Sequence, residues 1–283
     1  MTPHPPSLRL AVAQLRLVDG DRDANLGRIL EVLSAHGPTH DIVLLPETCT
    51  SGFASPEDVA RLAEPLDGPT VQALQSAARR HDLLVVAGIA ERAPEGLYNT
   101  AVLVDGDGLR GAYRKTHLWL DDRGMFLPGD RFVALPWRGT RVAPLICFDL
   151  EFPETARAVA GLGAELALAC NGNMEPYAPV HRLATAARAL ENQMFVAMAN
   201  RTGPGRRMNF AGGSLVAGPD GRVLAEAGTE ETVLSVTLQM ADVATARTAY
   251  DYLALRRVGL ALDSAVDGGS AARIPGSARA GRP

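Results

Sequence analysis

The sequence predicts an α/β protein that contains a mixed sheet, or two sheets, with helices outside. Short apolar runs typical of strands alternate with segments whose apolar residues recur at helical spacing. Two other pairs of apolar runs are separated by turn-forming residues, at 105–108 and at 219–221, which predicts hairpins. Because β-α-β units pair strands in parallel and hairpins pair them antiparallel, both kinds of pairing are expected.

The first half of the chain begins with a strand and a helix. Apolar residues share one face of the strand at 7–15, and they recur at helical spacing in the helix at 23–37. Asp23 is the expected N-cap of this helix, and Gly37 is its expected end. The elements that follow are a buried strand at 41–47, a helix at 69–81, a strand at 82–92 and a hairpin at 97–115.

The second half repeats the strand–helix order and then returns to a hairpin. Its expected elements are a strand at 138–147, a helix that begins near Pro153, a strand at 164–170, a helix from about Pro179 to Asn192, a strand at 194–200, a hairpin at 214–228 and a strand at 231–239. From Asp263 onward the chain is rich in Gly, Ala, Arg and Pro without periodicity. We therefore expect one domain at 1–262 and a tail at 263–283 that is mobile or forms an arm on a partner subunit.

Composition excludes several classes of protein. With 28 Lys and Arg against 32 Asp and Glu, the net charge is −4, so no basic surface for nucleic acid is expected. No apolar run is long enough to span a bilayer, and the first residues, MTPHPPS, lack the pattern of a signal peptide. The three cysteines form no C-x-x-C pair, which argues against a disulfide framework or a zinc site and favours the reducing cytoplasm.

Three polar residues stand at the points where apolar strands end. Glu47 closes the run DIVLLPE, Lys115 closes the hairpin at 97–115, and Cys147 closes the run PLIC. Singly, each has an ordinary explanation: Glu47 can cap a turn, Lys115 can be a solvated strand end, and Cys147 can be a small core residue. Because open α/β sheets place chemistry at the carboxyl ends of their strands, the three together predict one site.

An acid, an amine and a thiol suit acyl transfer from an amide. The thiolate of Cys147 can attack the carbonyl carbon and form a thioester, which divides one hydrolysis into two easier steps. A free thiol with a pKa of about 8.5 needs activation, and Glu47 can accept its proton and later activate water. The ammonium of Lys115 and the backbone N–H of Phe148 can stabilise the oxyanion.

Three segments together resemble one family. LLPETCTSGF, YRKTHLW and LICFDLEFPE are similar, in order and spacing, to motifs of the carbon–nitrogen hydrolase family, also called the nitrilase superfamily. The resemblance runs from about Leu8 to Arg257 and implies a carbon–nitrogen hydrolase domain with a triad of Glu47, Lys115 and Cys147. It also implies a four-layer α-β-β-α sandwich with mixed sheets, which commonly pairs its outer helices in a homodimer or higher homo-oligomer. No metal and no organic cofactor belong to this chemistry.

The motifs most resemble those of bacterial amidases that act on short aliphatic ω-amino amides, such as 5-aminopentanamide. True nitrilases usually carry a tryptophan after the catalytic cysteine, and this chain has Phe148 there. Hydrolases of N-carbamoyl amines share much of the framework, so ureide cleavage stays an alternative. Residues expected beside the substrate, each of which can instead serve packing or loop structure, are Phe53, Tyr98, Trp119, Asn173, Met174, Glu175 and Tyr177. Among them, Glu175 can bind a cationic amine tail.

The segment KTHLWLDDRGMF departs from the family pattern. Family members usually carry a second glutamate a few residues after the lysine, which positions the lysine and the substrate amide. Here only Asp121 and Asp122 are present, and a displacement of about 1 Å in a catalytic group can cost roughly 10²-fold in rate. Asp122 is the first candidate for this auxiliary role, and Asp121 is the second. If the role is missing, the chain is a catalytically weak binding or scaffold homologue; transfer of the acyl group to an amine is a further alternative.

Overall fold

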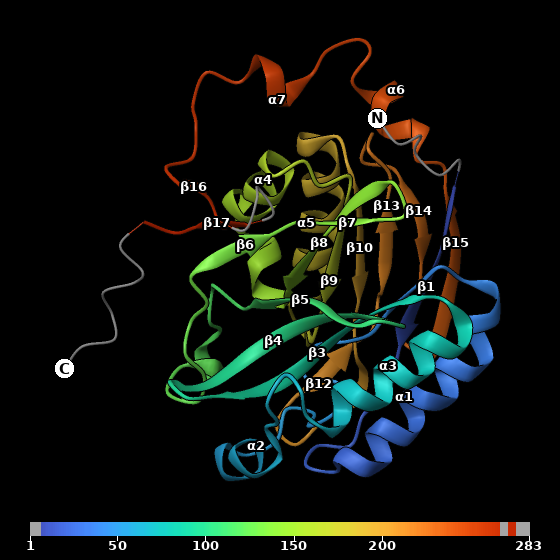
Figure 1. Cartoon of the computed structure of the whole chain (residues 1–283), viewed down its shortest axis with the longest axis vertical. Helices are drawn as coiled ribbons and strands as arrows, with labels where there is room; N and C mark the ends of the chain where they lie inside the picture. The colour runs from blue at the N-terminus through green and yellow to red at the C-terminus, as the bar shows by residue number, and fades with distance from the viewer. Residues whose placement is uncertain (1–6, 267–270, 276–283) are drawn as a thin grey trace.

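Two six-stranded sheets lie face to face between outer helices, which gives four α-β-β-α layers (Figure 1). The structure is a computed structural model and describes residues 7–266 and 271–275. Apolar side chains from the inner faces of both sheets form one continuous core between them. The prediction of a four-layer sandwich with mixed sheets is therefore confirmed.

The first sheet has the strand order β15-β1-β2-β3-β4-β5. Its strands are β15 (Thr232–Leu238), β1 (Leu8–Gln14), β2 (Ile42–Leu44), β3 (Leu84–Ala93), β4 (Gly96–Asp105) and β5 (Gly108–Arg114). β1, β2 and β3 are parallel to one another, whereas β15, β4 and β5 pair antiparallel with their neighbours. The parallel trio contains the expected β-α-β units, and β4 with β5 is the expected hairpin.

The second sheet repeats this plan in the order β14-β13-β10-β9-β8-β7. Its strands are β14 (Val223–Glu226), β13 (Leu215–Ala217), β10 (Phe195–Ala199), β9 (Leu166–Cys170), β8 (Thr140–Ile146) and β7 (Leu135–Trp137). β8, β9 and β10 are parallel, and the other three strands pair antiparallel. In both sheets, three central parallel strands bring their carboxyl ends to one edge, where open α/β sheets position functional groups.

Helices cover the outer face of each sheet and explain the alternation of residues along the strands. α1 (Arg22–His36) and α3 (Pro69–His81) lie against the first sheet, and α4 (Pro153–Gly161) and α5 (Ala178–Asn192) lie against the second (Figure 1). Along β1, Leu10 and Val12 join the core between the sheets, whereas Ala11 and Ala13 pack in the cluster beneath α1. None of the described helices is long and apolar enough to cross a membrane.

The N-cap of α1 is Asp21, so the prediction of Asp23 is wrong. The helix begins at Arg22, and Oδ1 of Asp21 accepts a hydrogen bond from N of Ala24 at 3.0 Å. Asp21 has the non-helical backbone angles φ −114° and ψ 85° that an N-cap requires. Asp23 lies in the first turn, where a carboxylate still interacts favourably with the helix dipole.

Several short elements are absent from the sequence prediction. They are α2 (Pro56–Leu62), α6 (Ala241–Ala246), α7 (Tyr252–Leu255), the 3₁₀ helices η1 (Gly37–Thr39), η2 (Leu120–Asp122) and η3 (Cys147–Glu151), and the strands β6 (Arg131–Val133), β7, β11 (Thr202–Pro204) and β12 (Asn209–Ala211). Elements this short contain too few apolar positions to show a period. η2 and η3 matter most for function, because one follows Lys115 and the other begins at Cys147.

Part of the expected C-terminal tail pairs with the rest of the chain. β17 (Ala271–Arg273) lies antiparallel to β6 and to β16 (Asp263–Val266), and N of Ile274 donates a hydrogen bond to O of Asp130 at 2.8 Å. The rest of the tail, at 267–270 and 276–283, lies outside the described residues, as do residues 1–6. The domain boundary at residue 262 and the role of the tail as a mobile segment or inter-subunit arm stay predictions.

Candidate active site

Glu47, Lys115 and Cys147 lie together at the ends of strands from both sheets. Glu47 follows β2 and Lys115 follows β5 in the first sheet, whereas Cys147 follows β8 in the second. Nζ of Lys115 lies 2.7 Å from Oε1 of Glu47. The Cys147 thiol lies close enough to both groups for their charges to shift its pKa. Three strands far apart in the sequence thus bring an acid, an amine and a thiol to one point.

The Lys115 ammonium is buried between two carboxylates. Besides Glu47, it contacts Oδ2 of Asp122 at 2.6 Å, and the Lys115 side chain is 1% exposed. Burial by itself lowers the pKa of Lys115, but the charges of Glu47 and Asp122 outweigh it and raise this pKa well above its usual range. Lys115 is therefore held as an ammonium, a group that can stabilise an oxyanion.

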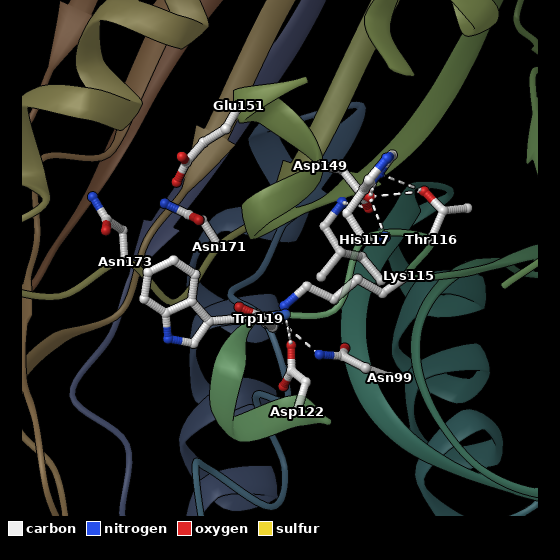
Figure 2. A network of polar contacts seen from close by, with 12 residues as sticks. Asn99, Lys115, Thr116, His117, Trp119, Asp122, Asp149, Glu151, Asn171 and Asn173 are labelled. Carbon is white, nitrogen blue, oxygen red and sulfur yellow. Dashed lines mark hydrogen bonds and ion pairs between the residues drawn. The ribbon is translucent and has the colours of Figure 1, made fainter. Parts of the chain in front are cut away.

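Asp122, rather than Asp121, is the aspartate that reaches Lys115 (Figure 2). Asp122 is buried in η2, where its Oδ2 also accepts a hydrogen bond from N of Trp119 at 3.1 Å. Asp121 is exposed and lines a neighbouring cavity instead. The tight 3₁₀ turn brings the shorter aspartate side chain within hydrogen-bond distance of the ammonium.

Glu47 has one paired oxygen and one unpaired oxygen. Oε1 accepts hydrogen bonds from Nζ of Lys115 and Nδ2 of Asn99, both at 2.7 Å. Oε2 is buried and has no hydrogen-bond partner of good geometry among the described residues. Burial raises the pKa of Glu47, although Lys115 and the nearby Cys147 thiol act in the opposite direction. The unpaired oxygen gives Glu47 the capacity to accept a proton from Cys147.

Cys147 stands at a strained turn. Its φ is +44°, in the left-handed region that residues other than glycine rarely adopt, and it is the first residue of η3. Burial raises the pKa of its thiol well above the usual range, and the charge of Glu47 adds to this, while Lys115 and the amide of Gly172 oppose it. The resting side chain is therefore a thiol, which needs a base in order to become a nucleophile.

Asp149 links η3 to the segment that follows β5 (Figure 2). Its buried carboxylate accepts hydrogen bonds from Oη of Tyr113 at 2.8 Å, from Oγ1 of Thr116 at 2.8 Å and from N of His117 at 3.0 Å. Nδ1 of His117 also lies 3.0 Å from Oδ1 of Asp149. This well-paired carboxylate fixes the segments that carry the amine and the thiol relative to each other.

Two glycines let other backbone segments approach Glu47. A Cβ atom on Gly172 would lie 2.8 Å from Oε2 of Glu47 and 2.4 Å from Cζ of Phe53. A Cβ atom on Gly88 would lie 2.6 Å from Cα of Glu47. Because glycine alone has no Cβ, any other residue at these positions displaces the acid or its neighbours.

A narrow cavity beside Cys147 holds most of the predicted substrate contacts. Its lining includes Phe53, Lys115, Trp119, Cys147, Phe148, Asn173, Met174 and Tyr177. Glu175 is not among the described residues that line this cavity, because its loop pairs with β12 through N of Glu175 and O of Asn209, at 2.9 Å, and its side chain is exposed. Tyr98 is also absent from this lining, since it is buried with the Arg114 guanidinium 3.7 Å from its ring centroid.

Phe148 contributes both a ring and a backbone amide to the site. Its ring packs edge to face against Trp119, with centroids 5.1 Å apart, and Trp119 packs in the same way against Tyr177 at 5.4 Å. The N–H of Phe148 lies in the first turn of η3, where helical amides have no intrahelical acceptor. This amide is thus able to donate to an oxyanion formed at Cys147.

Sequence reasoning missed four polar residues at the site: Asn99, Glu151, Asn171 and His181. Glu151 and His181 line the cavity, and Nδ1 of His181 lies 3.0 Å from Oδ1 of Asn171. A signal existed for two of them, because Glu151 comes four residues after Cys147 and Asn171 directly follows β9. Asn99 and His181 lie inside β4 and α5, where a polar residue carries no comparable signal. Among the residues described, no group of His, Cys, Asp or Glu is arranged to hold a metal ion.

The chain is similar to known proteins and to solved structures over most of its length. A family model described as carbon-nitrogen hydrolase matches residues 9–248. An (R)-stereoselective amidase from Pseudomonas sp. is 48% identical over 254 residues, which cover 89% of this chain and 93% of that protein. A 2-oxoglutaramate amidase from Bacillus subtilis (strain 168) is 36% identical over 216 residues, or 73% of this chain and 81% of the relative. The solved structure of a double mutant of the amidase from Nesterenkonia sp. AN1, in complex with acrylamide, has a TM-score of 0.80 and 29% identity, and covers 91% of this chain and 97% of that one.

Proposed function

Because the chain belongs to the carbon–nitrogen hydrolase family, we propose that it hydrolyses a small linear carboxamide through a thioester on Cys147. The chain is an amidase that acts on carbon–nitrogen bonds other than peptide bonds, as its similarity to two amidases indicates. The observation that carries the proposal is the unpaired Oε2 of Glu47 close to the Cys147 thiol, while Oε1 is held 2.7 Å from Nζ of Lys115.

The first half of the proposed reaction forms the thioester. Glu47 takes the proton from the Cys147 thiol, and the thiolate attacks the amide carbon. The oxyanion that forms meets the Lys115 ammonium and the N–H of Phe148, and one such donor contributes about 10²–10³-fold in rate. As the C–N bond breaks, Glu47 returns the proton to nitrogen, so that ammonia leaves and the acyl group stays on sulfur.

The second half consumes water. Glu47 accepts a proton from water, and the resulting hydroxide attacks the thioester carbon. The C–S bond breaks, the carboxylic acid leaves, and the Cys147 sulfur recovers its proton. Transfer of the acyl group to an amine instead of water stays an alternative, which added hydroxylamine tests because it would trap the acyl group as a hydroxamate.

Asp122 takes the auxiliary role expected of a second glutamate in this proposal. It lies 2.6 Å from Nζ of Lys115, so the ammonium keeps an anionic partner while Glu47 carries the proton. This contact supports an active enzyme over the alternative of a catalytically weak homologue.

We propose an ω-amino carboxamide as the substrate. The names of two relatives, an (R)-stereoselective amidase and a 2-oxoglutaramate amidase, suggest different acyl groups. A 2-oxo acid amide carries a carboxylate, whereas Lys115 is the only lysine or arginine among the described residues that line the cavity. Since Lys115 is already paired with two carboxylates, the lining suits a tail without negative charge.

Ammonia and carbon dioxide released from a panel of substrates test the proposal. The panel contains 5-aminopentanamide, 2-oxoglutaramate and N-carbamoyl amines. We expect ammonia without carbon dioxide, fastest from 5-aminopentanamide, and no turnover in a folded Cys147→Ala variant. Carbon dioxide together with ammonia from the ureides would instead support the carbamoylase alternative. Undiminished turnover by Cys147→Ala would contradict a thioester intermediate on Cys147.

We also propose that the chain forms a homodimer through α5, on the outside of the second sheet. Three apolar side chains of α5 are exposed, namely Val180 at 40%, Leu183 at 72% and Leu190 at 43%. Light scattering of the wild type and of Leu183→Glu tests this, because a charge in an apolar interface should yield monomers.

The free thiols of Cys49, Cys147 and Cys170 suit a reducing compartment, so the cytoplasm is the proposed location.

A further inference from the structure

Glu151 places a carboxylate in the wall of the cavity beside the nucleophile. It is the last residue of η3, which begins at Cys147, and both residues line the cavity. Its side chain is 28% exposed, and Figure 2 shows its carboxylate pointing toward the region of Asn171 and Asn173. Four residues of 3₁₀ helix rise about 8 Å, so Glu151 and Cys147 are separated by the length of a small molecule.

No lysine or arginine of the described chain forms an ion pair with the Glu151 carboxylate. Oε1 of Glu151 lies 3.1 Å from Nε2 of His181, and the carboxylate has no other partner among the described residues. The Arg188 guanidinium contacts this segment, but it donates to the backbone oxygen of Glu151 at 3.0 Å and to the carboxylate of Glu191 at 3.0 Å. One carboxylate oxygen of Glu151 is therefore available to a bound molecule.

The charges around the cavity are unbalanced. Lys115 is paired with the carboxylates of Glu47 and Asp122, and Glu151 adds a third carboxylate in the lining that Lys115 shares. Among these four side chains, three negative charges against one positive charge leave an excess of two, and the excess is still one when Glu47 holds a proton. Such a cavity favours a cationic ligand and disfavours a ligand with an anionic tail.

We propose that Glu151 binds the ammonium group of an amino-amide substrate. The inference rests on the proposed amide hydrolysis and defines its substrate class: carboxamides with a cationic amine, in a chain or a ring, a few bonds from the carbonyl carbon. The rings of Trp119, Phe148 and Tyr177 line the same cavity and offer surfaces that attract a cation and pack against methylene groups. Glu151 thus takes the role that the sequence assigns to Glu175.

Two substrates of equal size separate ammonium binding from general catalysis. 5-Aminopentanamide and hexanamide differ only in their terminal group, which is an ammonium in the first and a methyl group in the second. We expect the wild type to prefer 5-aminopentanamide by about 10-fold or more in kcat/KM. In Glu151→Gln, kcat/KM for 5-aminopentanamide should fall about 10- to 100-fold, mainly through KM, because the ammonium loses its anionic partner and keeps at most a hydrogen bond to a neutral amide oxygen. For hexanamide the change should stay below about threefold, within the scatter of a neutral substitution.

Glu154→Gln is the matched control, because Glu154 is an exposed carboxylate in the first turn of α4 and does not line the cavity. It should alter kcat/KM for neither substrate. Calorimetric binding of both amides to Cys147→Ala, with and without Glu151→Gln, provides a readout that needs no turnover, and the preference for the amine should disappear with the carboxylate.

Equal losses on both substrates, or no loss on either, would overturn the role of Glu151. Hydrolysis of hexanamide as fast as 5-aminopentanamide by the wild type would sink this inference and the preference for ω-amino amides, and it would leave the proposed hydrolysis of a linear carboxamide intact. Absence of turnover on every amide tested would sink both.

Discussion

Asp149 and Glu47 are both fully buried carboxylates beside the reactive thiol, and their surroundings differ in one respect. Four donor groups surround the two oxygens of Asp149, namely Oη of Tyr113, Oγ1 of Thr116, N of Ile146 and N of His117, and Nδ1 of His117 also lies 3.0 Å from Oδ1. Glu47 accepts two hydrogen bonds, both at Oε1, and its Oε2 is unpaired. One carboxylate is therefore saturated with donors, and the other is half open.

This difference in hydrogen bonding indicates different roles for the two carboxylates, proton transfer for Glu47 and positioning for Asp149. Donors occupy both oxygens of Asp149 and come from the segments that carry Lys115 and Cys147, so this carboxylate holds those segments in place. A buried oxygen without a partner costs about 1–3 kcal/mol, and folded proteins keep few of them. The contrast supports Glu47 as the proposed base and Asp149 as a residue that positions the thiol and the amine.

Glu47→Gln tests whether the unpaired oxygen of Glu47 accepts a proton during the reaction. The glutamine keeps an oxygen for Lys115 and Asn99 but cannot accept a proton, so we expect kcat to fall about 10²–10⁴-fold. The thermal midpoint should change little, since the substitution preserves shape. Steady-state kinetics and thermal unfolding of one preparation check this, and a variant with more than a tenth of wild-type kcat would contradict the role of Glu47.

Asp149→Asn tests the positioning role of Asp149, and both the free energy of unfolding and kcat should fall in this variant. The new NH₂ group faces donors in place of one oxygen, which costs about 1–3 kcal/mol in the free energy of unfolding. Because the segments that carry Lys115 and Cys147 then shift, we also expect kcat to fall about 10- to 10²-fold. Denaturant unfolding and kinetics measure both effects.

Thr116→Val is the milder control for Asp149→Asn, since it removes one donor and leaves the carboxylate in place. It should cost about 1 kcal/mol in the free energy of unfolding, with a smaller loss of kcat. A stable Asp149→Asn variant with a low kcat would mean that Asp149 takes part in the chemistry itself.

The pH dependence of kcat/KM tests whether Glu47 is the group that must be ionised. Burial raises the pKa of Glu47 above its ordinary value of 4.5, and the proposed base works only when ionised. The kcat/KM should therefore be full above this raised pKa and fall about tenfold per pH unit below it, with a midpoint that belongs to the coupled cluster of Glu47, Lys115 and Cys147. Asp149→Asn should retain this acid limb. A limb at or below the ordinary glutamate range would count against Glu47 as the base.

Gly172→Ala should lower activity less than Glu47→Gln does. Its Cβ would lie 2.8 Å from the open oxygen of Glu47 and 2.4 Å from Phe53, so we expect kcat/KM to fall about tenfold as the base is displaced. Gly27→Ala is the control, since Gly27 is exposed in α1 and its Cβ would meet nothing within 4 Å. That variant should keep wild-type activity and gain up to about 1 kcal/mol of stability. Equal activity in both variants would show that Gly172 makes no room for Glu47.

The regular elements could be predicted because their signals are local. α3 spans Pro69–His81, as its first-turn proline and its apolar spacing predict. Short elements such as η2 and η3 could not be predicted, since a single turn has no period. The assignment of strands to two sheets followed from the family resemblance, because an apolar run does not show which neighbours it pairs with.

The site could be predicted only where it follows strand ends. Glu47, Lys115 and Cys147 each close an apolar run, so topology alone brings them to one edge. The choice between Asp121 and Asp122 depends on side-chain direction in η2, which the sequence pattern does not contain. Glu151 comes four residues after Cys147, but whether its side chain reaches the cavity depends on the turn of η3, which the sequence pattern does not contain.

Because the site combines residues from two sheets, amide hydrolysis requires both sheets to be assembled, and activity therefore measures assembly. A chain divided at 138–139, in the exposed turn between β7 and β8, would place the acid and the amine on one fragment and the thiol on the other. Neither fragment alone would hydrolyse an amide. Turnover recovered on mixing would count the fragment pairs that have completed both sheets, because β7 and β15 would each pair with strands of the other fragment. A colorimetric ammonia assay would thus measure a protein–protein association.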